Sequence, residues 1–401
     1  MSTTTDRASQ VHTLETEVQD FLASHDPKTM EPIEFLRARY DAGLAWVNYP
    51  EGRGGKGLAR SLQRGVDEQF AAAGSPDNRS SINVIGLGMA APTLLKYAGA
   101  DNLDERLRSL WTGEEVWCQL FSEPGAGSDL AGLATSAVQQ ETGDWLINGQ
   151  KVWTSMAHEA DYALLVTRSD PDKVKHAGMT YFFLRTDTPG VDIRPLRQIT
   201  GEAEFNEVFL DDVLIPDSQR LGGRGEGWAV SQTTLMNERV AIGGRVIPRE
   251  GGPIRPAAQA WRKHPEARAA ALHDRLLTSW VEAEATRLTT IRLGQQLATG
   301  APGPEGSTVK LAYSNIAQQV TGLELEILGE DALRYENYEM RRPDIEHRTN
   351  WSPGYRFLRS KGNSIEGGTS EIMRNIIAER VLGLPPEPRV DKDVPWKEIS
   401  K

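Results

Sequence analysis

The chain has 401 residues and a formal net charge of −11, because 56 Asp and Glu outnumber 45 Lys and Arg. This acidic balance disfavours nucleic acid and anionic membrane surfaces as main partners. We find neither a run of about 20 apolar residues nor an apolar signal-peptide stretch at the start, so we expect a cytoplasmic protein with no integral membrane part.

Cysteine and histidine usage predicts no metal site. The single cysteine, Cys118, cannot form an internal disulfide, which fits a reducing compartment, and we interpret it as a small core residue. The seven histidines are scattered without paired ligand spacing, so no metal is predicted. The chain also lacks a G-x-S-x-G elbow, which leaves a serine hydrolase without support.

The first part of the chain, residues 1–115, has the periodicity of an α-helical domain. Apolar residues recur at three- and four-residue spacing, as at Val18, Phe21 and Leu22. A glycine-rich run at 50–57 interrupts the helices. Because this run lacks the G-K-[ST] ending of a phosphate-binding loop, we interpret it as a turn.

A strand that runs into a glycine-rich loop follows at residues 115–129. The β-branched and aromatic residues of 115–121 predict the strand, and the glycines of the next segment let backbone N–H groups approach a ligand. Ser122 and Ser128 add hydroxyl groups to this loop. The alternative is an ordinary turn, because a Gly-rich turn alone binds nothing more often than it binds a phosphate.

A second informative run spans residues 146–155. Asn148-Gly149 between two alternating segments predicts a β-hairpin, whose returning strand ends at Trp153-Thr154-Ser155. An indole followed by two hydroxyls can stack on a flat heteroaromatic ring and hydrogen-bond to its edge. For Trp153 alone, a core tryptophan is the more common explanation.

Residues 116–225 have a period of two and predict a middle β domain. Short strands are expected at 162–168, 179–185, 191–196 and 205–210. Hairpin spacing with few intervening helices predicts an antiparallel barrel or sandwich. No G-x-G-x-x-G fingerprint opens a helix, which disfavours a nicotinamide-binding Rossmann domain.

The helical period returns over residues 226–386 and stops at Gly383-Leu384-Pro385-Pro386. Two stretches rich in Pro and Gly, 248–265 and 299–307, predict loops within this helical domain. The polar tail, 387–401, is expected to be poorly packed. The predicted architecture is therefore α+β, with an N-terminal helical domain, a middle β domain and a C-terminal helical bundle.

The helix around Glu238 carries a carboxylate on an apolar stripe. Glu238 shares its face with Leu235, Ala241 and Ile242. In an arbitrary protein, a boundary glutamate paired with a neighbouring Arg is the more common arrangement. The alternative is a desolvated base, because burial makes a carboxylate a better acceptor for a weakly acidic C–H proton.

Four runs of this chain, in order and spacing, resemble the flavin-dependent acyl-CoA dehydrogenase family from about residue 10 to about residue 385. They are residues 120–129, 146–155, 237–239 and 365–372. The resemblance implies the family's fold, FAD as cofactor, and oxidation of an acyl-CoA to the trans-2-enoyl-CoA. It further implies an electron-transferring flavoprotein as electron acceptor and a homodimer or homotetramer.

In such enzymes a glutamate removes the α-proton of the thioester while the β-hydrogen leaves as hydride to flavin N5. The resemblance places this base at Glu238, as in isovaleryl-CoA, long-chain and steroid-side-chain members. Other members carry it in the loop where this chain has Gly367, which makes Glu366, one residue early, the runner-up. The backbone of Gly367 and Gly368 would hold the thioester carbonyl.

The resemblance also assigns the remaining contacts. Implied substrate contacts are Ser128, Arg239 and Gly368. The residues implied to contact FAD are Leu120, Phe121, Ser122, Ser128, Trp153, Thr154, Ser155, Thr369 and Glu371.

The chain departs from the family pattern in three respects. The sequences that begin at Arg249 and Arg262 stand where many members carry Arg-x-x-Phe-Gly, an FAD anchor across a subunit interface. Residues 326–330 replace Gln-x-x-Gly-Gly and add a carboxylate, which would disfavour a nearby diphosphate. Phe121 replaces a residue that is usually aliphatic.

These departures leave two other functions open. One is a half-site or non-catalytic subunit of a heteromeric acyl-CoA dehydrogenase, in which a different chain completes the FAD site. The other is a flavin monooxygenase or oxidase on the same fold. The presence of both Glu238 and Arg239 argues against them, because an oxygenase needs no base for a thioester α-proton.

Overall fold

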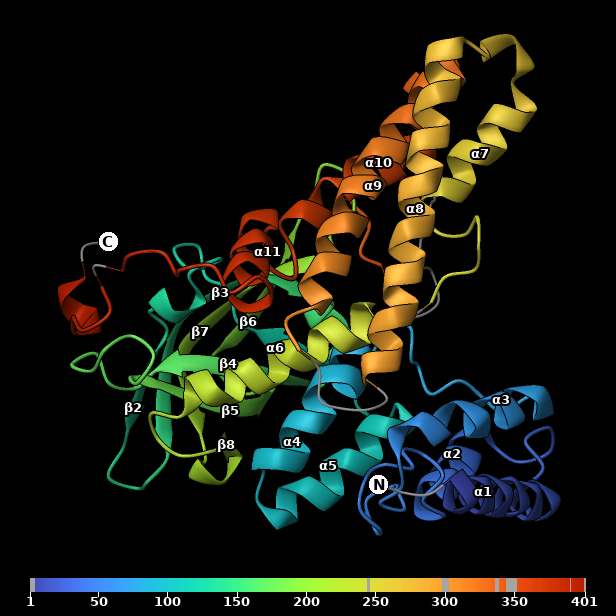
Figure 1. The fold of residues 1–401 in the computed structure, drawn as a ribbon. Helices are drawn as coiled ribbons and strands as arrows, with labels where there is room; N and C mark the ends of the chain where they lie inside the picture. Colours follow the sequence, from blue (N-terminus) through green and yellow to red (C-terminus); the bar gives the residue numbers. More distant parts are fainter. Residues whose placement is uncertain are drawn as a thin grey trace. The chain divides into compact units, whose positions relative to one another are not determined.

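The computed structural model describes residues 4–243, 246–297, 303–335, 339–343, 352–389 and 391–399, without the side chains of 4–7, 238–243 and 297. The chain divides into two compact units, Met1–Cys118 with Ala160–Tyr162 and Gln119–Glu159 with Ala163–Lys401. Helices come first, strands follow and helices return (Figure 1). The predicted α+β class and the order of its parts are confirmed.

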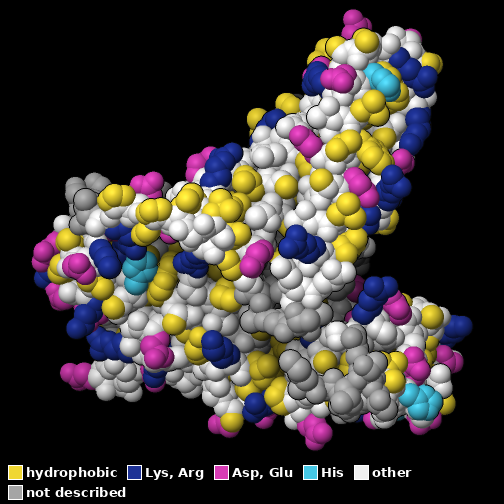
Figure 2. Space-filling view, in the orientation of Figure 1, with side chains coloured by type: hydrophobic (Ala, Val, Ile, Leu, Met, Phe, Trp, Pro, Cys, Tyr) yellow, Lys and Arg dark blue, Asp and Glu magenta, His cyan; other side chains and the backbone are white. Residues whose placement is uncertain are grey.

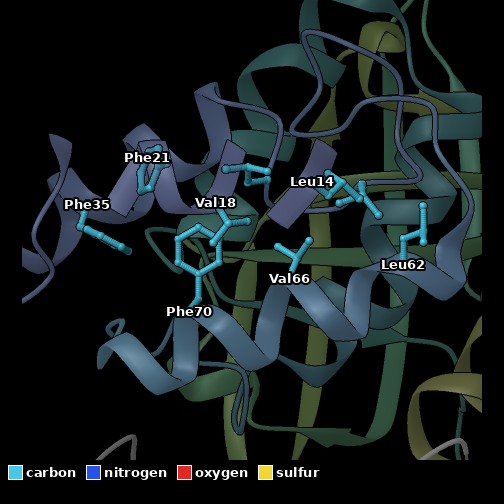
Figure 3. Close-up of a cluster of buried hydrophobic side chains, with 9 residues drawn as sticks. Leu14, Val18, Phe21, Phe35, Leu62, Val66 and Phe70 are labelled. Carbon is cyan, nitrogen blue, oxygen red and sulfur yellow. The ribbon is translucent and has the colours of Figure 1, made fainter. Parts of the chain in front are cut away.

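The first unit is helical. Its core is a cluster of apolar side chains in which Phe21, Phe35 and Phe70 meet edge to face at ring separations of 5.5–6.1 Å (Figure 3). Val18, from the apolar stripe seen in the sequence, has no exposed surface. The helices are α1 (Thr4–Ser24), α2 (Pro32–Asp41), α3 (Gln63–Ala73), α4 (Ala91–Tyr97) and α5 (Ala100–Thr112).

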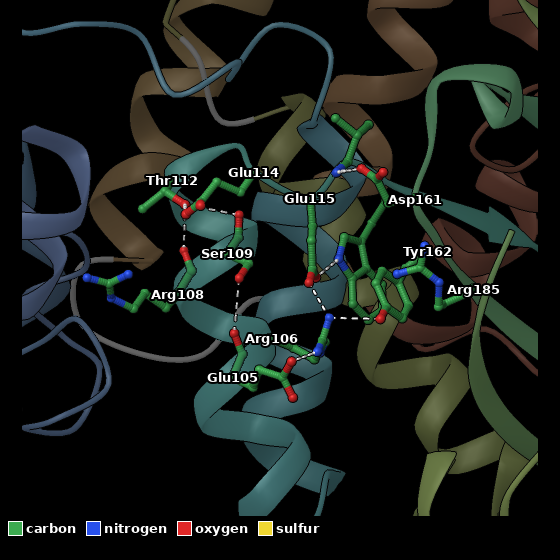
Figure 4. Close-up of polar contacts among 12 residues, drawn as sticks. Glu105, Arg106, Arg108, Ser109, Thr112, Glu114, Glu115, Asp161, Tyr162 and Arg185 are labelled. Carbon is green, nitrogen blue, oxygen red and sulfur yellow. Dashed lines mark hydrogen bonds and ion pairs between the residues drawn. The ribbon is translucent and has the colours of Figure 1, made fainter. Parts of the chain in front are cut away.

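A buried polar cluster follows α5 in the same unit (Figure 4). Glu115 forms an ion pair with Arg106 and accepts a hydrogen bond from Trp117 Nε1 at 3.2 Å, while Arg106 also donates to Tyr162 Oη at 2.8 Å. Burial raises the pKa of Glu115 to about 7, although Arg106 opposes this shift. Cys118 is buried as predicted, and burial raises the pKa of its thiol to about 12.

The strands form one eight-stranded sheet in the order β6-β7-β3-β2-β4-β5-β8, with β1 pairing with β4. Antiparallel pairs dominate, and β2 and β4 run parallel where Ser136 meets Arg168. All four strands predicted at 162–210 are present. The strands are β1 (Trp117–Leu120), β2 (Ser136–Gln139), β3 (Trp145–Ser155), β4 (Tyr162–Arg168), β5 (Met179–Arg185), β6 (Val191–Leu196), β7 (Phe205–Ile215) and β8 (Arg220–Leu221).

The hairpin predicted at Asn148-Gly149 is wrong, because β3 passes through these residues without turning. The register of β3 against β7 shifts here, which marks a β-bulge. Asn148 Nδ2 donates to Asp212 Oδ1, and Asn148 Oδ1 accepts from Asp212 N, both at 2.9 Å. A Cβ on Gly149 would lie 2.5 Å from Thr135 Oγ1. Asn-Gly therefore serves a bulge and a close approach to the neighbouring strand.

The second unit continues into helices that pack on one another through a second apolar core, which joins α7, α8 and α9. None of the described helices combines the length and apolarity needed to cross a bilayer. The helices are α6 (Gly227–Gly243), α7 (Ile254–Lys263), α8 (Ala270–Leu297), α9 (Gly306–Leu328), α10 (Pro353–Ser360) and α11 (Ser370–Ile376).

The loop predicted over 248–265 is wrong for most of its length, because α7 occupies it. Its prolines do not break the helix, since Pro253 precedes it and Pro256 lies in the first turn, where no N–H is needed for the helical ladder. Ala257 and Ala260 are strong helix formers and are buried in the core of these helices. The second predicted loop, 299–307, ends where α9 begins, and residues 298–302 lie outside the described residues.

The tail is also better packed than its polar sequence predicts. Trp396 Nε1 donates to Gly132 O at 3.1 Å, and Trp396 N donates to Lys173 O at 2.9 Å. The guanidinium of Arg168 stacks 4.9 Å from the centre of the Trp396 ring. The single indole of Trp396 thus attaches residues 391–399 to the β domain. The polar composition of the tail does not predict this contact.

Candidate functional site

The two runs that the sequence singled out lie side by side. Val152 N donates to Ser122 O at 2.9 Å, and Lys151 Nζ donates to Phe121 O at 3.1 Å and to Val166 O at 2.8 Å. The start of the glycine-rich loop is therefore fixed against β3, one residue before Trp153. The structure brings these two parts of the predicted site together.

A buried ion pair holds this junction. Lys151 has no exposed surface and lies 2.8 Å from Glu123 Oε1, while the Glu123 carboxylate accepts from the N–H groups of Ala134 and Thr135 at 2.7 and 2.9 Å. Burial lowers the pKa of Lys151 to about 8, although Glu123 opposes this shift. Burial raises the pKa of Glu123, but Lys151 and the two N–H donors lower it by more. The pKa of this carboxyl therefore lies below its usual value. The sequence does not predict this pair, because Glu123 stands before Pro124-Gly125, a pattern typical of an ordinary turn.

Trp153 presents an exposed ring at this junction. Its backbone is left-handed, with φ of 61°, and 58% of the residue is exposed. The indole meets Phe205 edge to face at 5.8 Å. A left-handed non-glycine residue costs about 1–3 kcal/mol and persists only where its surroundings impose it. The exposed ring is therefore a feature that the fold maintains against local strain.

Thr154 lies beside it with an unpaired hydroxyl. The residue is 1% exposed, and among the described residues its Oγ1 has no hydrogen-bond partner. A buried polar atom normally finds a partner, so this hydroxyl is available to a ligand or a water. Together, Trp153 and Thr154 fit the face and the polar edge of a flat heteroaromatic ring.

The other predicted contacts of the β domain differ in exposure. Leu120 and Phe121 are buried, and Phe121 packs edge to face on Tyr181 at 5.8 Å. Ser122 and Ser155 are half-buried, and Ser128 is exposed. The unusual Phe121 is thus explained by packing on Tyr181, and the serines remain accessible.

Tyr181 also connects the sheet to α6. Its Oη lies 3.0 Å from Thr234 Oγ1, and α6 lies along β5 (Figure 1). The helix backbone continues through Glu238 and Arg239, whose side chains lie outside the described residues. The helix that carries the predicted base is therefore anchored to a residue that also contacts the glycine-rich run.

The loop before α11 carries the other candidate base. Both oxygens of Glu366 accept from Arg359 at 3.0 Å, and Arg359 also pairs with Glu204 at 3.2 Å. Gly367 and Gly368 have left-handed φ values of 63° and 94°. Within the described part of the chain, neither glycine N–H has a hydrogen-bond partner.

Two side chains of α9 and the cap of α11 hold this loop in place. Lys310 Nζ donates to Gly368 O and Ser314 Oγ donates to Asn363 O, both at 2.6 Å. Thr369 Oγ1 accepts from Ile372 N at 3.2 Å and caps α11. The loop is thus rigidly attached.

Two acidic residues that the sequence singled out have arginine partners. Glu371 is exposed and pairs with Arg374 at 3.0 Å. Glu326, in the segment that departs from the family pattern, pairs with Arg275 at 2.5 Å, which offsets its added charge. Among the described residues, no group of three or more His, Cys, Asp and Glu side chains is placed to hold a metal ion.

Sequence comparison identifies the family. The model for the acyl-CoA dehydrogenase middle domain matches residues 118–213, and the model for the acyl-CoA dehydrogenase C-terminal domain matches residues 225–382. The acyl-CoA dehydrogenase IpdE1 of Mycobacterium tuberculosis is 36% identical over 349 residues, which cover 86% of each chain. The acyl-CoA dehydrogenase FadE34 of the same organism is 39% identical over 348 residues, and the chain spans only 45% of its length.

Solved structures share the fold. The structure of the Tcur3481-Tcur3483 steroid ACAD has a TM-score of 0.68 at 24% identity, with 95% of this chain and 98% of that chain covered. Butyryl-CoA dehydrogenase from Megasphaera elsdenii has a TM-score of 0.67 at 19% identity, with 93% and 98% covered. The family models span more than half of the residues, and with the 36% identity to IpdE1 they establish that this chain is an oxidoreductase of the acyl-CoA dehydrogenase family.

Proposed function

We propose that the chain is an FAD-dependent dehydrogenase that converts an acyl-CoA thioester to the trans-2-enoyl-CoA. The observation that carries this proposal is the exposed, left-handed Trp153 beside the buried, unpaired hydroxyl of Thr154. An indole face and a hydroxyl suit the face and edge of a flavin ring. When bound, the flavin accepts the β-hydride of the substrate.

Glu238 is the proposed base for the α-proton. The runner-up, Glu366, accepts hydrogen bonds from Arg359 with both oxygens, so its carboxylate is already held in a two-point ion pair. Glu238 lies one helical turn beyond Thr234, which contacts the sheet through Tyr181. Arg239 is proposed to bind the CoA part of the substrate.

The loop at Gly367 and Gly368 is proposed to hold the thioester carbonyl. Removal of the α-proton moves negative charge onto this oxygen, and preorganised N–H donors stabilise such charge best. The two glycine N–H groups are unpaired within the described residues, and the loop that carries them is held by α9.

The remaining contacts follow the family pattern. Leu120, Phe121, Ser122 and Ser155 are proposed to lie along the flavin. Ser128 is proposed to contact the diphosphate or the substrate. Thr369 and Glu371 are proposed to contact the adenine half.

A homo-oligomer and an electron-transferring flavoprotein complete the proposal. Helix α8 exposes Leu277, Val281 and Leu288, spaced four and seven residues apart and each 51–60% exposed. Figure 2 shows hydrophobic side chains between charged ones along this part of the surface. Such an apolar stripe suits packing against a second copy.

Anaerobic bleaching of the flavin absorbance tests the proposed function. A panel of acyl-CoAs, including bulky polycyclic ones because of the steroid enzyme among the solved structures, is added to wild type, Glu238→Gln and Glu366→Gln. We expect one thioester class to bleach wild type and Glu366→Gln, and Glu238→Gln to react at least about 100-fold more slowly. Equal loss in both variants would remove the assignment of the base.

A second candidate is a half-site in a heteromeric enzyme. It is favoured by two structures of the same fold that are each named for two proteins, Tcur3481-Tcur3483 and ChsE4-ChsE5. The FAD content of the purified chain separates the two. Stoichiometric FAD supports the first proposal, whereas FAD binding that appears only after addition of a second acyl-CoA dehydrogenase chain supports the half-site. A flavin that no thioester bleaches supports an oxidase or monooxygenase.

A further inference from the structure

Lys310 of α9 contacts the loop before α11, and the proposed function assigns it no role. Its ammonium donates to the carbonyl of Gly368 at 2.6 Å. Gly368 has φ of 94°, and a Cβ there would lie 2.4 Å from Met373 Cε. This position therefore requires glycine, and the orientation of the peptide that follows it is set by the lysine.

Lys310 acts together with Ser314, one helical turn further along α9. Residues four apart share a helix face, and Ser314 Oγ holds the carbonyl of Asn363 at 2.6 Å. The same face of α9 therefore hydrogen-bonds to both ends of the loop at 363–368. Between these two points, Glu366 is held by Arg359 of α10.

We infer that Lys310 is a positioning residue for the thioester carbonyl. By fixing the peptide that follows Gly368, it restrains the loop that carries the unpaired N–H groups of Gly367 and Gly368, so these groups need no rearrangement as the enolate forms. It also places a positive charge at the loop where negative charge develops. This inference rests on the proposed function.

Exchange of the substrate α-hydrogen tests the inference without hydride transfer. The probe is a thia-acyl-CoA, in which sulfur replaces the β-carbon, so that its α-proton can be removed but no β-hydride can leave. The full chain with FAD is incubated with this probe in D2O, and α-deuteration is followed by mass spectrometry. The dissociation constant of the probe and the FAD content are measured in parallel.

In Lys310→Met we expect exchange to slow by about 10- to 100-fold, because a small misplacement of positioned groups has effects of this size. Probe affinity and FAD content stay close to wild type. Lys361→Met is the matched control, because Lys361 flanks the same loop and its ammonium contacts only the Phe357 ring, 3.9 Å from the centre, among the contacts described. This control should exchange at the wild-type rate.

Lys310→Arg should restore most of the exchange rate, and Lys310→Gln should not. If Lys310→Met loses FAD or does not fold, the difference in exchange rate between Lys310→Arg and Lys310→Gln tests the inference instead. The inference is overturned if the lysine variants exchange at the wild-type rate, or if exchange and probe affinity fall together. Wild type that neither exchanges the probe nor is bleached by any thioester overturns the proposed function itself.

Discussion

The ammonium of Lys151 lies 2.8 Å from Glu123 Oε1, in a place that solvent does not reach. The same ammonium holds the carbonyl of Phe121. One cation therefore joins the strand that carries Trp153 to the loop that carries Ser122.

Lys151→Met should lower the free energy of unfolding by about 3–5 kcal/mol, because it leaves a buried carboxylate without its partner. Denaturant unfolding of the FAD-loaded protein measures this change. The matched control is Arg64→Met, which breaks the exposed Arg64–Glu68 pair of α3 and should cost under about 0.5 kcal/mol. A similar loss of unfolding free energy in both variants would mean that the buried pair stabilises the fold no more than an exposed pair does.

Trp153→Ala should weaken FAD binding by about tenfold, because stacking on an aromatic side chain contributes about 1–3 kcal/mol. Titration of the apoprotein with FAD, followed by flavin fluorescence, measures the affinity. Trp153→Phe keeps a ring and should lose less. An alanine variant with wild-type affinity would place the flavin elsewhere.

Glu115 should make stability depend on pH. Its pKa is about 7 in the folded protein, against the ordinary glutamate value of 4.5, so the folded protein binds extra protons between these two pH values. The free energy of unfolding should therefore fall as pH rises from about 4.5 to about 7, by up to about 3 kcal/mol, and stay reduced above pH 7. Glu115→Gln should flatten this slope.

The control for this pH dependence is Glu105→Gln, since Glu105 is exposed and touches the same Arg106. It should leave the slope unchanged. Equal slopes for wild type and Glu115→Gln in urea unfolding would contradict the expectation.

Trp396→Ala should loosen the segment after the glycine-rich loop. The substitution removes the hydrogen bond to Gly132 O and the stacking on Arg168, so amide exchange at residues 130–133 should accelerate by about five- to tenfold, which corresponds to about 1 kcal/mol. Hydrogen–deuterium exchange with mass spectrometry detects this. Exchange in α7 serves as the internal control, and unchanged protection at 130–133 would show that the tail only rests on the surface.

Local pattern was sufficient to predict the α+β class and many of the helices and strands. The strands at 162–168 and 179–185 follow from runs of β-branched and aromatic residues, and the helical parts follow from three- and four-residue spacing. Residues 254–263 were missed because prolines at the start of a helix look like loop signals. Asn148-Gly149 was misread because its deciding contact is with Asp212, 64 residues away.

The site was predictable only in part. Motifs placed Ser122 and Trp153 in the same site, and the Val152–Ser122 hydrogen bond brings their segments together. The contacts that support them join residues 28 and 58 positions apart, as in Lys151 with Glu123 and Lys310 with Gly368. No local spacing encodes such pairs, because only the folded chain brings them within reach.

The second irregularity of β3, between Lys151 and Thr154, changes the phase of the strand. In a regular strand, residues three apart point to opposite faces, yet Lys151 and Thr154 are both buried while Trp153 between them faces outward. One extra residue therefore lets a single strand turn both the ammonium of Lys151 and the unpaired hydroxyl of Thr154 inward. Transplanting these side chains onto another sheet would require the bulge as well, because in a regular strand of the same sequence Trp153 would face inward and Thr154 outward.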